Sequence, residues 1–454
     1  MKKQATFGGT LIMTLAVVIM FVVIFSSLAG LVSRQFRAGN RAVKQETAFQ
    51  IAEAGLNDGR WRLVHNDEDT STLSKDVSDP FGGVLGSYEV TFEKHAGAKL
   101  FTLTSVGVTN TPIQETVTLE AQYGIPSVAQ YALVSNENLF ISPNGEVAGK
   151  VHANGGVRMD GQSDSSVTSA VATYVCPIHH GCALEEKPGV WGSGEDESLW
   201  DFPVAPIDYA GMILDFIDMK SDAQTAGSYY GPSDNEGYHI VFNDDNTYTL
   251  YEVLARRAPI PSYLPDTDFQ TLSHDILTEL IVGTYTIPAE GIILVEDDVW
   301  IEGEIRSHVT LGAAVFPDHP STRPDIILNG DISYGDVRDG TRMFAAISQG
   351  NIYIPFYAAE EKLELDGAYI AQHGRVARRH YVGLEAEHIT KDELEVYGMI
   401  ASNQEPIFSW EVLSDPVSGY IDVELSYDPH LLFGPPPLIP DSGDYALRSW
   451  EYIE

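Results

Sequence analysis

The chain has 454 residues, of which 44% are hydrophobic and two are cysteines, and its formal net charge at pH 7 is −38. This composition is typical of a globular protein, and the length allows two or three domains without disulfide or metal staples. Because so acidic a surface repels phosphate groups, we expect no nucleic-acid partner.

The charge is distributed unevenly along the chain. Within residues 1–64 the acidic residues are Glu46, Glu53 and Asp58, and they are outnumbered by basic ones. The basic residues of that segment are Lys2, Lys3, Arg34, Arg37, Arg41, Lys44, Arg60 and Arg62. The rest of the chain is strongly acidic, which predicts a basic, membrane-facing stalk joined to an acidic head.

A long apolar segment follows the N-terminal lysines. No charged residue lies between Gln4 and Ser33, and Leu11–Val32 is long enough to span a hydrocarbon core of roughly 30 Å. A cleavable signal peptide is the alternative, but its apolar region is usually about 7–15 residues long. We therefore expect a retained transmembrane helix.

The helical pattern continues beyond the apolar segment. Its apolar residues recur at three- and four-residue steps, as on one stripe of an amphipathic helix. They are Phe36, Val43, Phe49, Ile51, Ala52, Leu56 and Leu63. A helix from Thr10 to about Val64 is roughly 80 Å long, so about half of it must stand outside the membrane.

The stalk carries a motif that resembles a known family. Arg37-Ala-Gly-Asn40, followed by Ala48-Phe49-Gln-Ile-Ala-Glu53-Ala54-Gly55, resembles the helix signature of type IV pilin-like proteins, and among them the PilX-like minor pilins. The resemblance implies that the helix assembles with other pilin-like subunits after passing through the inner or cytoplasmic membrane. It also implies an exported C-terminal head, although the positive-inside count favours a cytoplasmic one.

The first residues resemble a prepilin leader. Lys2 and Lys3 precede Gly8 and Gly9, where the resemblance implies cleavage by a membrane peptidase. Major pilins carry Glu at the fifth mature position, whereas this chain places Met13 or Thr14 there. That departure resembles the tip-located K-type pseudopilins of type II secretion.

The remaining chain predicts an α+β protein with a small antiparallel sheet and a mainly-β head. The expected segments are a leader-like segment 1–9, a helix 10–64, a small sheet 65–124 and a head 125–454 with insertions at 163–200 and 201–260. Period-two alternation at residues 88–92, 101–104 and 115–119 predicts a meander packed on the helix.

Gly-punctuated apolar segments recur through the head. They centre on Gly303, Gly330, Gly350, Gly367 and Gly398, with an earlier one at residues 144–155. Such segments are typical of the rungs of a right-handed β-helix, or solenoid, and a β-sandwich is the alternative.

Other elements of the head are expected within the insertions and at its end. Residues 209–219 have helical spacing, and residues 238–251 predict a hairpin around the turn Asn243–Asn246. The tail, with Tyr427-Asp-Pro429, Pro435–Pro437 and Ser449-Trp-Glu451, resembles that of PilX-like proteins with solenoid heads.

The densest group of metal-ligating side chains is Cys176-Pro-Ile-His179-His180-Gly-Cys182. A zinc site usually places its cysteines two to four residues apart, and adjacent His179 and His180 are not expected to face one ion. In an exported domain we favour a disulfide between Cys176 and Cys182. Free thiols and a metal site remain alternatives, and no cofactor is expected.

Acidic residues in a solenoid also suggest a polysaccharide hydrolase or lyase. The candidates are Asp297, Asp298, Asp331, Asp366 and Glu385. Catalysis requires two carboxylates within several ångströms at one cleft, which spacing alone does not show, so we expect a solvated acidic face and no enzyme. Asn243–Asn246 lacks the spacing of a calcium loop and is better explained as a turn.

Three functions therefore compete at the level of sequence. The first is a filament-associated minor pilin or pseudopilin. The second is a membrane-anchored adhesin whose head binds a cationic surface or a glycan. The third is an anchored carbohydrate-active enzyme.

Overall fold

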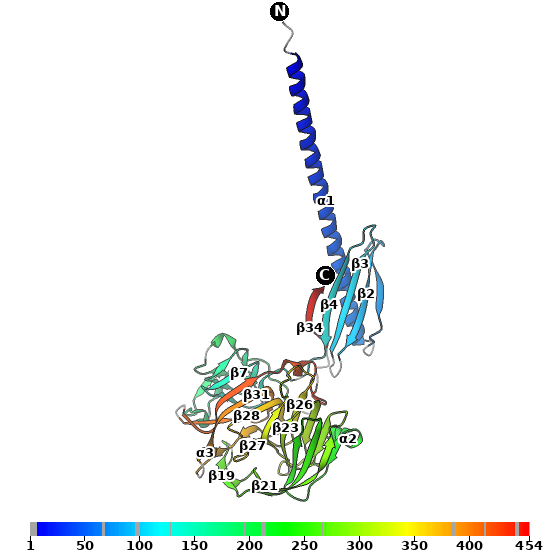
Figure 1. Cartoon of the computed structure of the whole chain (residues 1–454). Coiled ribbons are helices and arrows are strands. Elements are labelled where there is room, and N and C mark those ends of the chain that lie inside the picture. The colour runs from blue at the N-terminus through cyan, green and yellow to red at the C-terminus, as the bar shows by residue number, and fades with distance from the viewer. Residues whose placement is uncertain are drawn as a thin grey trace, which may run out of the picture. The chain divides into compact units, whose positions relative to one another are not determined.

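The computed structural model divides the chain into two compact units, Met1–Gly124 with Asp444–Glu454, and Ile125–Gly443. It describes residues 7–65, 69–95, 100–127, 129–194, 196–209, 215–265, 267, 269–383, 386–412, 415–440 and 445–453. The α+β class expected from the sequence is confirmed: a long N-terminal helix is followed by strands (Figure 1).

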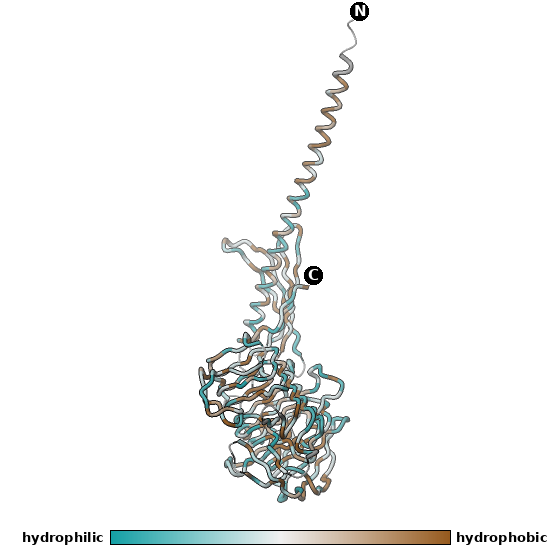
Figure 2. Tube along the Cα trace, turned by 90° about the vertical axis from the view of Figure 1, so that its left-hand side faces the viewer, coloured by the Kyte–Doolittle hydropathy of each residue, from teal (hydrophilic) through white to brown (hydrophobic). Residues whose placement is uncertain are grey.

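The first unit begins with α1 (Phe7–His65), a helix of 59 residues and therefore about 90 Å long. Side chains from Leu11 to Val43 are exposed, whereas Ala48, Ile51 and Leu56 are buried against a sheet. Figure 2 shows the same division, with α1 mostly apolar toward its N-terminus and more hydrophilic farther along. By length and composition, α1 is the one helix among the described residues that qualifies as a membrane span.

The sheet of the first unit is antiparallel, in the order β1-β2-β3-β4-β34. Its strands are β1 (Leu73–Ser78), β2 (Val84–Lys94), β3 (Leu100–Thr109), β4 (Thr116–Gly124) and β34 (Ala446–Ile453). The predicted meander corresponds to β2, β3 and β4. The sequence missed β1 and assigned the last strand to the head, whereas β34 pairs with β4 through contacts such as Trp450 with Ala121.

The second unit, the head, is built from short strands that stack in parallel on three faces. On face A each strand pairs in parallel with the next one in the list that follows. They are β16 (Ser228–Tyr230), β22 (Ile292–Val295), β24 (His308–Ala313), β26 (Met343–Ser348), β28 (Lys362–Ala371), β31 (Thr390–Ser402), β5 (Leu133–Ser135), β8 (Val151–Ala153), β11 (Val167–Ser169) and β15 (Trp200–Asp201).

Faces B and C complete each rung. Face B contains β17 (Gly237–Phe242), β23 (Val299–Glu304), β25 (Ile326–Ser333), β27 (Ile352–Ile354) and β29 (Val376–Arg378), and separately β6 (Leu139–Ile141), β9 (Val157–Met159) and β14 (Val190–Trp191). Face C contains the ends of β23 and β25, the starts of β28 and β31, then β33 (Asp415–Ser426), β7 (Gly145–Ala148) and β10 (Gln162–Ser163). This parallel stacking is the arrangement expected of a solenoid, whereas a β-sandwich has antiparallel sheets. Its handedness stays a prediction.

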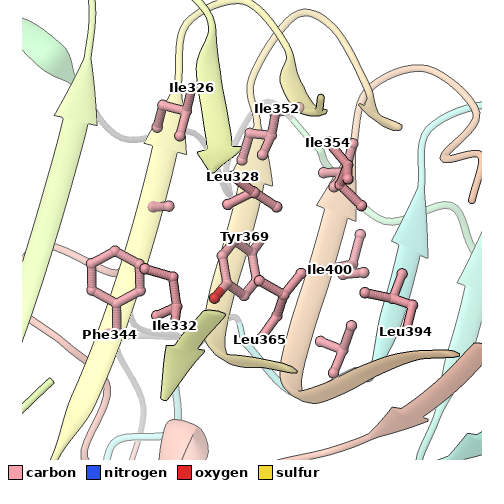
Figure 3. Packing of buried hydrophobic residues seen from close by; sticks show 14 of the residues in the cluster. Ile326, Leu328, Ile332, Phe344, Ile352, Ile354, Leu365, Tyr369, Leu394 and Ile400 are labelled. Carbon is pink, nitrogen blue, oxygen red and sulfur yellow. The ribbon is translucent and has the colours of Figure 1, made fainter. Parts of the chain in front are cut away.

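Apolar side chains fill the space inside the rungs. Figure 3 shows them following one another from β25 to β31, with Leu328, Tyr369 and Ile400 among them. Gly367 and Gly398 lie opposite each other in β28 and β31, where each strand turns from face C to face A. Both have positive φ, 130° and 152°, which explains why glycine occupies the corner.

The order of rungs in space differs from their order in the chain. β31 pairs with β5 on face A, and β33 pairs with β7 on face C. The chain therefore enters the stack in its middle, builds rungs outward to β15, resumes at the far end with β16, and returns to the middle. Nothing in the sequence predicts this circular order.

The segments predicted as insertions contain some strands that belong to the three faces and other elements that lie outside them. The predicted hairpin is confirmed as β17 and β18, but β17 also belongs to face B. The helix expected at residues 209–219 corresponds in part to α2 (Phe216–Thr225), whose first turn is capped by the Asp215 carboxylate accepting from Ile217 N. The earlier part of that prediction, residues 210–214, lies outside the described residues. The elements outside the faces are β12 (Thr173–Val175), β13 (Glu186–Pro188), β18 (Thr247–Arg256), β19 (Ile260–Tyr263), β20 (Gln270–Leu272), β21 (Ile276–Thr286), β30 (His380–Tyr381), β32 (Ser409–Val412), α2 (Phe216–Thr225), α3 (Ala386–Ile389), and the 3₁₀ turns Ile178–His180, Glu197–Leu199 and Pro429–Leu432.

Candidate functional site

The motif predicted to direct assembly divides into buried and exposed residues. Ala48 and Gly55 face the sheet: a Cβ on Gly107 of β3 would lie 2.4 Å from Ala48 O, and a Cβ on Gly55 would lie 2.2 Å from Ser105 Oγ. These small residues therefore allow α1 to lie directly on its own sheet.

Other motif residues take different positions. Ala54 and Phe49 are half-buried, and the Phe49 ring meets Trp450 of β34 edge-on at 6.0 Å. Arg37, Asn40 and Glu53 are exposed. The sequence did not distinguish this exposed group from the buried residues of the motif. Gly8 and Gly9 lie within the first turns of α1, and cleavage beside them stays a prediction.

The head contains a large apolar cavity where face B is interrupted. Ala377 of β29 bridges to Ile407, but among the described residues no ladder connects Ile407 to β6. A cavity of about 640 Å³ lies at this gap, lined by Ile407 and by Leu139 of β6. Faces A and C are not interrupted here, because β31 pairs with β5 and β33 pairs with β7. The cavity therefore lies at the boundary between the half of the stack that contains β5 to β15 and the half that contains β16 to β33. We call this boundary the seam.

Two histidines and one glutamate meet at the wall of this cavity. His179 Nε2 donates to Glu405 Oε2 at 2.7 Å, and His180 Nε2 donates to Glu405 Oε1. Burial raises the pKa of Glu405, but the hydrogen bonds from both histidines outweigh burial and lower the pKa to about 2. From the sequence, adjacent His179 and His180 are not expected to face one ion; here the 3₁₀ turn Ile178–His180 directs both rings toward one carboxylate, that of Glu405.

The cysteines bracket that turn. Cys176 and Cys182 are joined by a disulfide with their Cα atoms 5.7 Å apart, the pairing favoured from the sequence. The Arg158 guanidinium also donates to His180 O and lies 4.9 Å from the Phe140 ring of β6. The turn that contains the histidines is therefore fixed by the disulfide at its two ends and by the hydrogen bond from Arg158.

The candidate catalytic carboxylates are engaged in hydrogen bonds and ion pairs with neighbouring strands and loops of the head. Asp297 accepts from Ser233 N at 2.8 Å, and Asp298 pairs with Arg256 at 2.7 Å. Asp331 accepts from Glu364 N at 2.8 Å.

Asp366 of β28 is engaged in the same way. It accepts from Tyr334 N at 2.7 Å and pairs with Arg338 at 2.9 Å, while burial raises its pKa to about 6. None of these four residues lines the cavity, and Glu385 lies outside the described residues.

The proposed calcium-like segment is a hairpin turn, as the sequence favoured. Asp245 accepts from Thr247 N at 3.1 Å, and Asn246 has a φ of 64°. Its side chains close the turn between β17 and β18.

Sequence reasoning missed two groups. Glu405 carries no local signal, since it lies more than 200 residues from the histidines that it meets. The second group is a line of carboxylates on face C, here called the carboxylate ladder. In-register pairing stacks Glu364, Glu395, Glu424 and Glu146 on successive rungs.

The chain matches no protein-family profile and no curated protein. Among solved structures it is similar to the competence-associated pilin ComZ from Thermus thermophilus, with 15% sequence identity and a TM-score of 0.31. The superposition covers 90% of this chain and 98% of that chain.

Proposed function

We propose that the chain is a structural subunit of a type IV pilus or a type II secretion-like filament, displaying a large acidic head. The observation that carries this proposal is the division of α1. The side chains from Leu11 to Val43 are exposed, while the part from Ala48 to Leu63 packs on a five-stranded sheet.

An exposed apolar helix of this length requires a partner. Before assembly the lipid of the cytoplasmic membrane covers Leu11–Val32, and in a filament the helices of other pilin-like subunits take the place of lipid. The chain is then a single-pass membrane protein with an exported head that reaches the cell surface in the filament. Arg37, Asn40 and Glu53 are exposed on α1 and are the residues that we assign to contacts with neighbouring subunits.

A position at the filament tip is a finer part of the proposal. If the leader is cut after Gly8 or Gly9, the mature chain lacks an acidic fifth residue. A subunit without that charge has no need of a partner ahead of it, as in the K-type pseudopilins that it resembles. The PilX-like signature is compatible with the same minor-subunit role.

A surface adhesin is the second candidate, supported by the carboxylate ladder. The carboxylates stack at a strand spacing of about 4.8 Å. Arg338 pairs with Glu364 and Glu395 at one end of the ladder, so the local negative potential that favours a cationic partner lies toward Glu424 and Glu146. This activity is compatible with filament membership. We do not assign catalysis, because the candidate carboxylates that the structure describes are engaged in hydrogen bonds and ion pairs within the head and none of them lines the cavity.

The test compares two arginine substitutions at exposed valines on α1. Val23 is 62% exposed within the apolar segment, and Val43 is 66% exposed beyond it. Val23→Arg places a charge at mid-span, which costs about 2.5–3.5 kcal/mol on insertion, whereas Val43→Arg places the same charge outside the membrane.

We expect Val23→Arg to lose membrane retention and to be absent from sheared filaments, while Val43→Arg retains membrane association. Immunogold labelling with an antibody against the head then locates the protein on purified filaments. Equal fractionation of both variants contradicts the membrane helix. A wild-type protein that stays in the membrane and never appears in filaments favours the adhesin.

A further inference from the structure

We propose that His179, His180 and Glu405 form a binding site for a first-row divalent transition metal ion, of which zinc is the representative. The ion links the two halves of the head at the seam on face B. This inference goes beyond the filament role and does not depend on it.

The geometry brings one ligand atom from each residue to the same place. One ring nitrogen of each histidine and one carboxylate oxygen of Glu405 all lie within 4.8 Å of one another. Zinc binds imidazole nitrogen at about 2.0–2.1 Å and carboxylate oxygen at about 2.0–2.2 Å, so neighbouring ligand atoms in a tetrahedral site lie about 3.3 Å apart. Small rotations of side chains that already face one another satisfy these distances.

The backbone around the site is fixed on both sides. The disulfide and the 3₁₀ turn hold His179 and His180. Glu405 lies two residues before Ile407, which bridges to Ala377 of face B. Ligands held in this way are preorganised for an ion, and His180 and Glu405 are buried where water competes least.

The donor atoms select the class of ion. Two imidazoles and one carboxylate suit zinc and its first-row neighbours, whereas calcium and magnesium prefer oxygen ligands alone. The thiols are joined to each other, so they do not contribute. Three protein ligands leave a fourth position for water or for a group inside the adjoining cavity.

The position in the fold indicates what the ion does. His179 and His180 belong to the half of the stack that contains β6, and Glu405 belongs to the half that ends with β33. Face B has no described ladder between these halves, and an ion bound by both replaces the missing connection. Because the complete ligand set exists only in the folded head, binding stabilises the fold by mass action.

The experiment uses the full chain in detergent micelles, stripped of metal by a chelator and then titrated with zinc. Isothermal titration and thermal unfolding are measured for the wild type, Glu405→Gln and His179→Gln. His373→Gln is the control, because His373 is a partly exposed histidine near Asp318 that does not line the cavity. We expect one zinc ion per wild-type chain, a raised Tm, at least tenfold weaker binding for each ligand variant and no change for the control.

Cobalt provides an independent readout of the ligands. Cobalt bound to imidazole and carboxylate in a low-coordinate site gives visible d–d absorption without a thiolate charge-transfer band. Retention of the wild-type zinc affinity in both ligand variants, or a thiolate band, overturns the assignment. Absence of zinc binding to the wild type also overturns it and leaves Glu405 as a carboxylate that only accepts hydrogen bonds. If Glu405→Gln does not fold, His179→Gln decides, since its side chain is 30% exposed and less critical to packing.

Discussion

Glycines at the corners of the rungs are positions where the fold tolerates few substitutions. A Cβ on Gly398 would lie 1.9 Å from Gly367 O, whereas a Cβ on Gly383, which also has positive φ, meets nothing within 4 Å. Gly398→Ala therefore combines backbone strain with a clash against fixed backbone, and we expect a loss of about 3 kcal/mol or more in the free energy of unfolding. Gly383→Ala introduces strain alone and is expected to lose about 1 kcal/mol. Urea unfolding of both variants in micelles measures the difference, and equal losses contradict the role of the corner.

The carboxylate ladder predicts a dependence of stability on pH. Burial, followed by the charges of Glu393, Glu146 and Glu395, raises the pKa of Glu424. A carboxyl with a raised folded-state pKa binds a proton more readily when folded, so it favours folding at low pH and this contribution is lost as the pH rises through that pKa.

We therefore expect Glu424→Gln to be more stable than the wild type at pH 7, by about 0.3 kcal/mol, since the site is largely solvated. The advantage should disappear near pH 4 and diminish in high salt. Glu290→Gln, at an exposed turn outside the ladder, is the matched control for loss of one charge. Urea titrations at both pH values test this, and an advantage that persists at low pH would falsify the like-charge explanation.

At the scale of elements, we expect the disulfide to stabilise the turn that it encloses and not the fold of the whole head. Closing a short loop stabilises by about 2 kcal/mol on the chain-entropy model. Replacing Cys176 and Cys182 together by Ala should loosen the turn Ile178–His180, seen as faster proteolysis there, while the solenoid core stays folded. Intact mass after alkylation without reductant should show no label on the wild type. Two labels under those conditions contradict the pairing.

Which elements the sequence predicts depends on how local their determinants are. The helix α1, the strands β2 to β4 and the hairpin of β17 and β18 follow from periodicity and turn residues that lie within each segment. The partner of β34, β4, lies more than 300 residues earlier in the chain, so the place of β34 in the first unit is not a local property. The meeting of Glu405 with the histidines is non-local in the same way.

At the scale of the whole chain, the last residues of the head lie beside its first residues. Ser127 N donates to Leu432 O at 2.6 Å, and Ser127 Oγ donates to Leu431 O at 2.7 Å. The rungs between these points form a continuous core with apolar side chains from both halves. Because both ends of the head lie together, its separation from the first unit breaks no rung. The head therefore meets the structural condition for independent folding.

We expect residues 125–443 alone to fold cooperatively and to remain monomeric, since the acidic surface opposes association. A fragment of residues 125–454 should behave differently, because it retains β34 without its partner β4. That strand carries the exposed side chains Leu447, Trp450 and Tyr452, and an unpaired apolar edge strand promotes pairing between chains. Light scattering after size exclusion should give a single monomer for the shorter fragment and concentration-dependent association for the longer one, while circular dichroism reports the same folded head in both. An unfolded shorter fragment contradicts the independent folding of the head, and association of equal strength in the two fragments contradicts the assignment of β34 to the first unit.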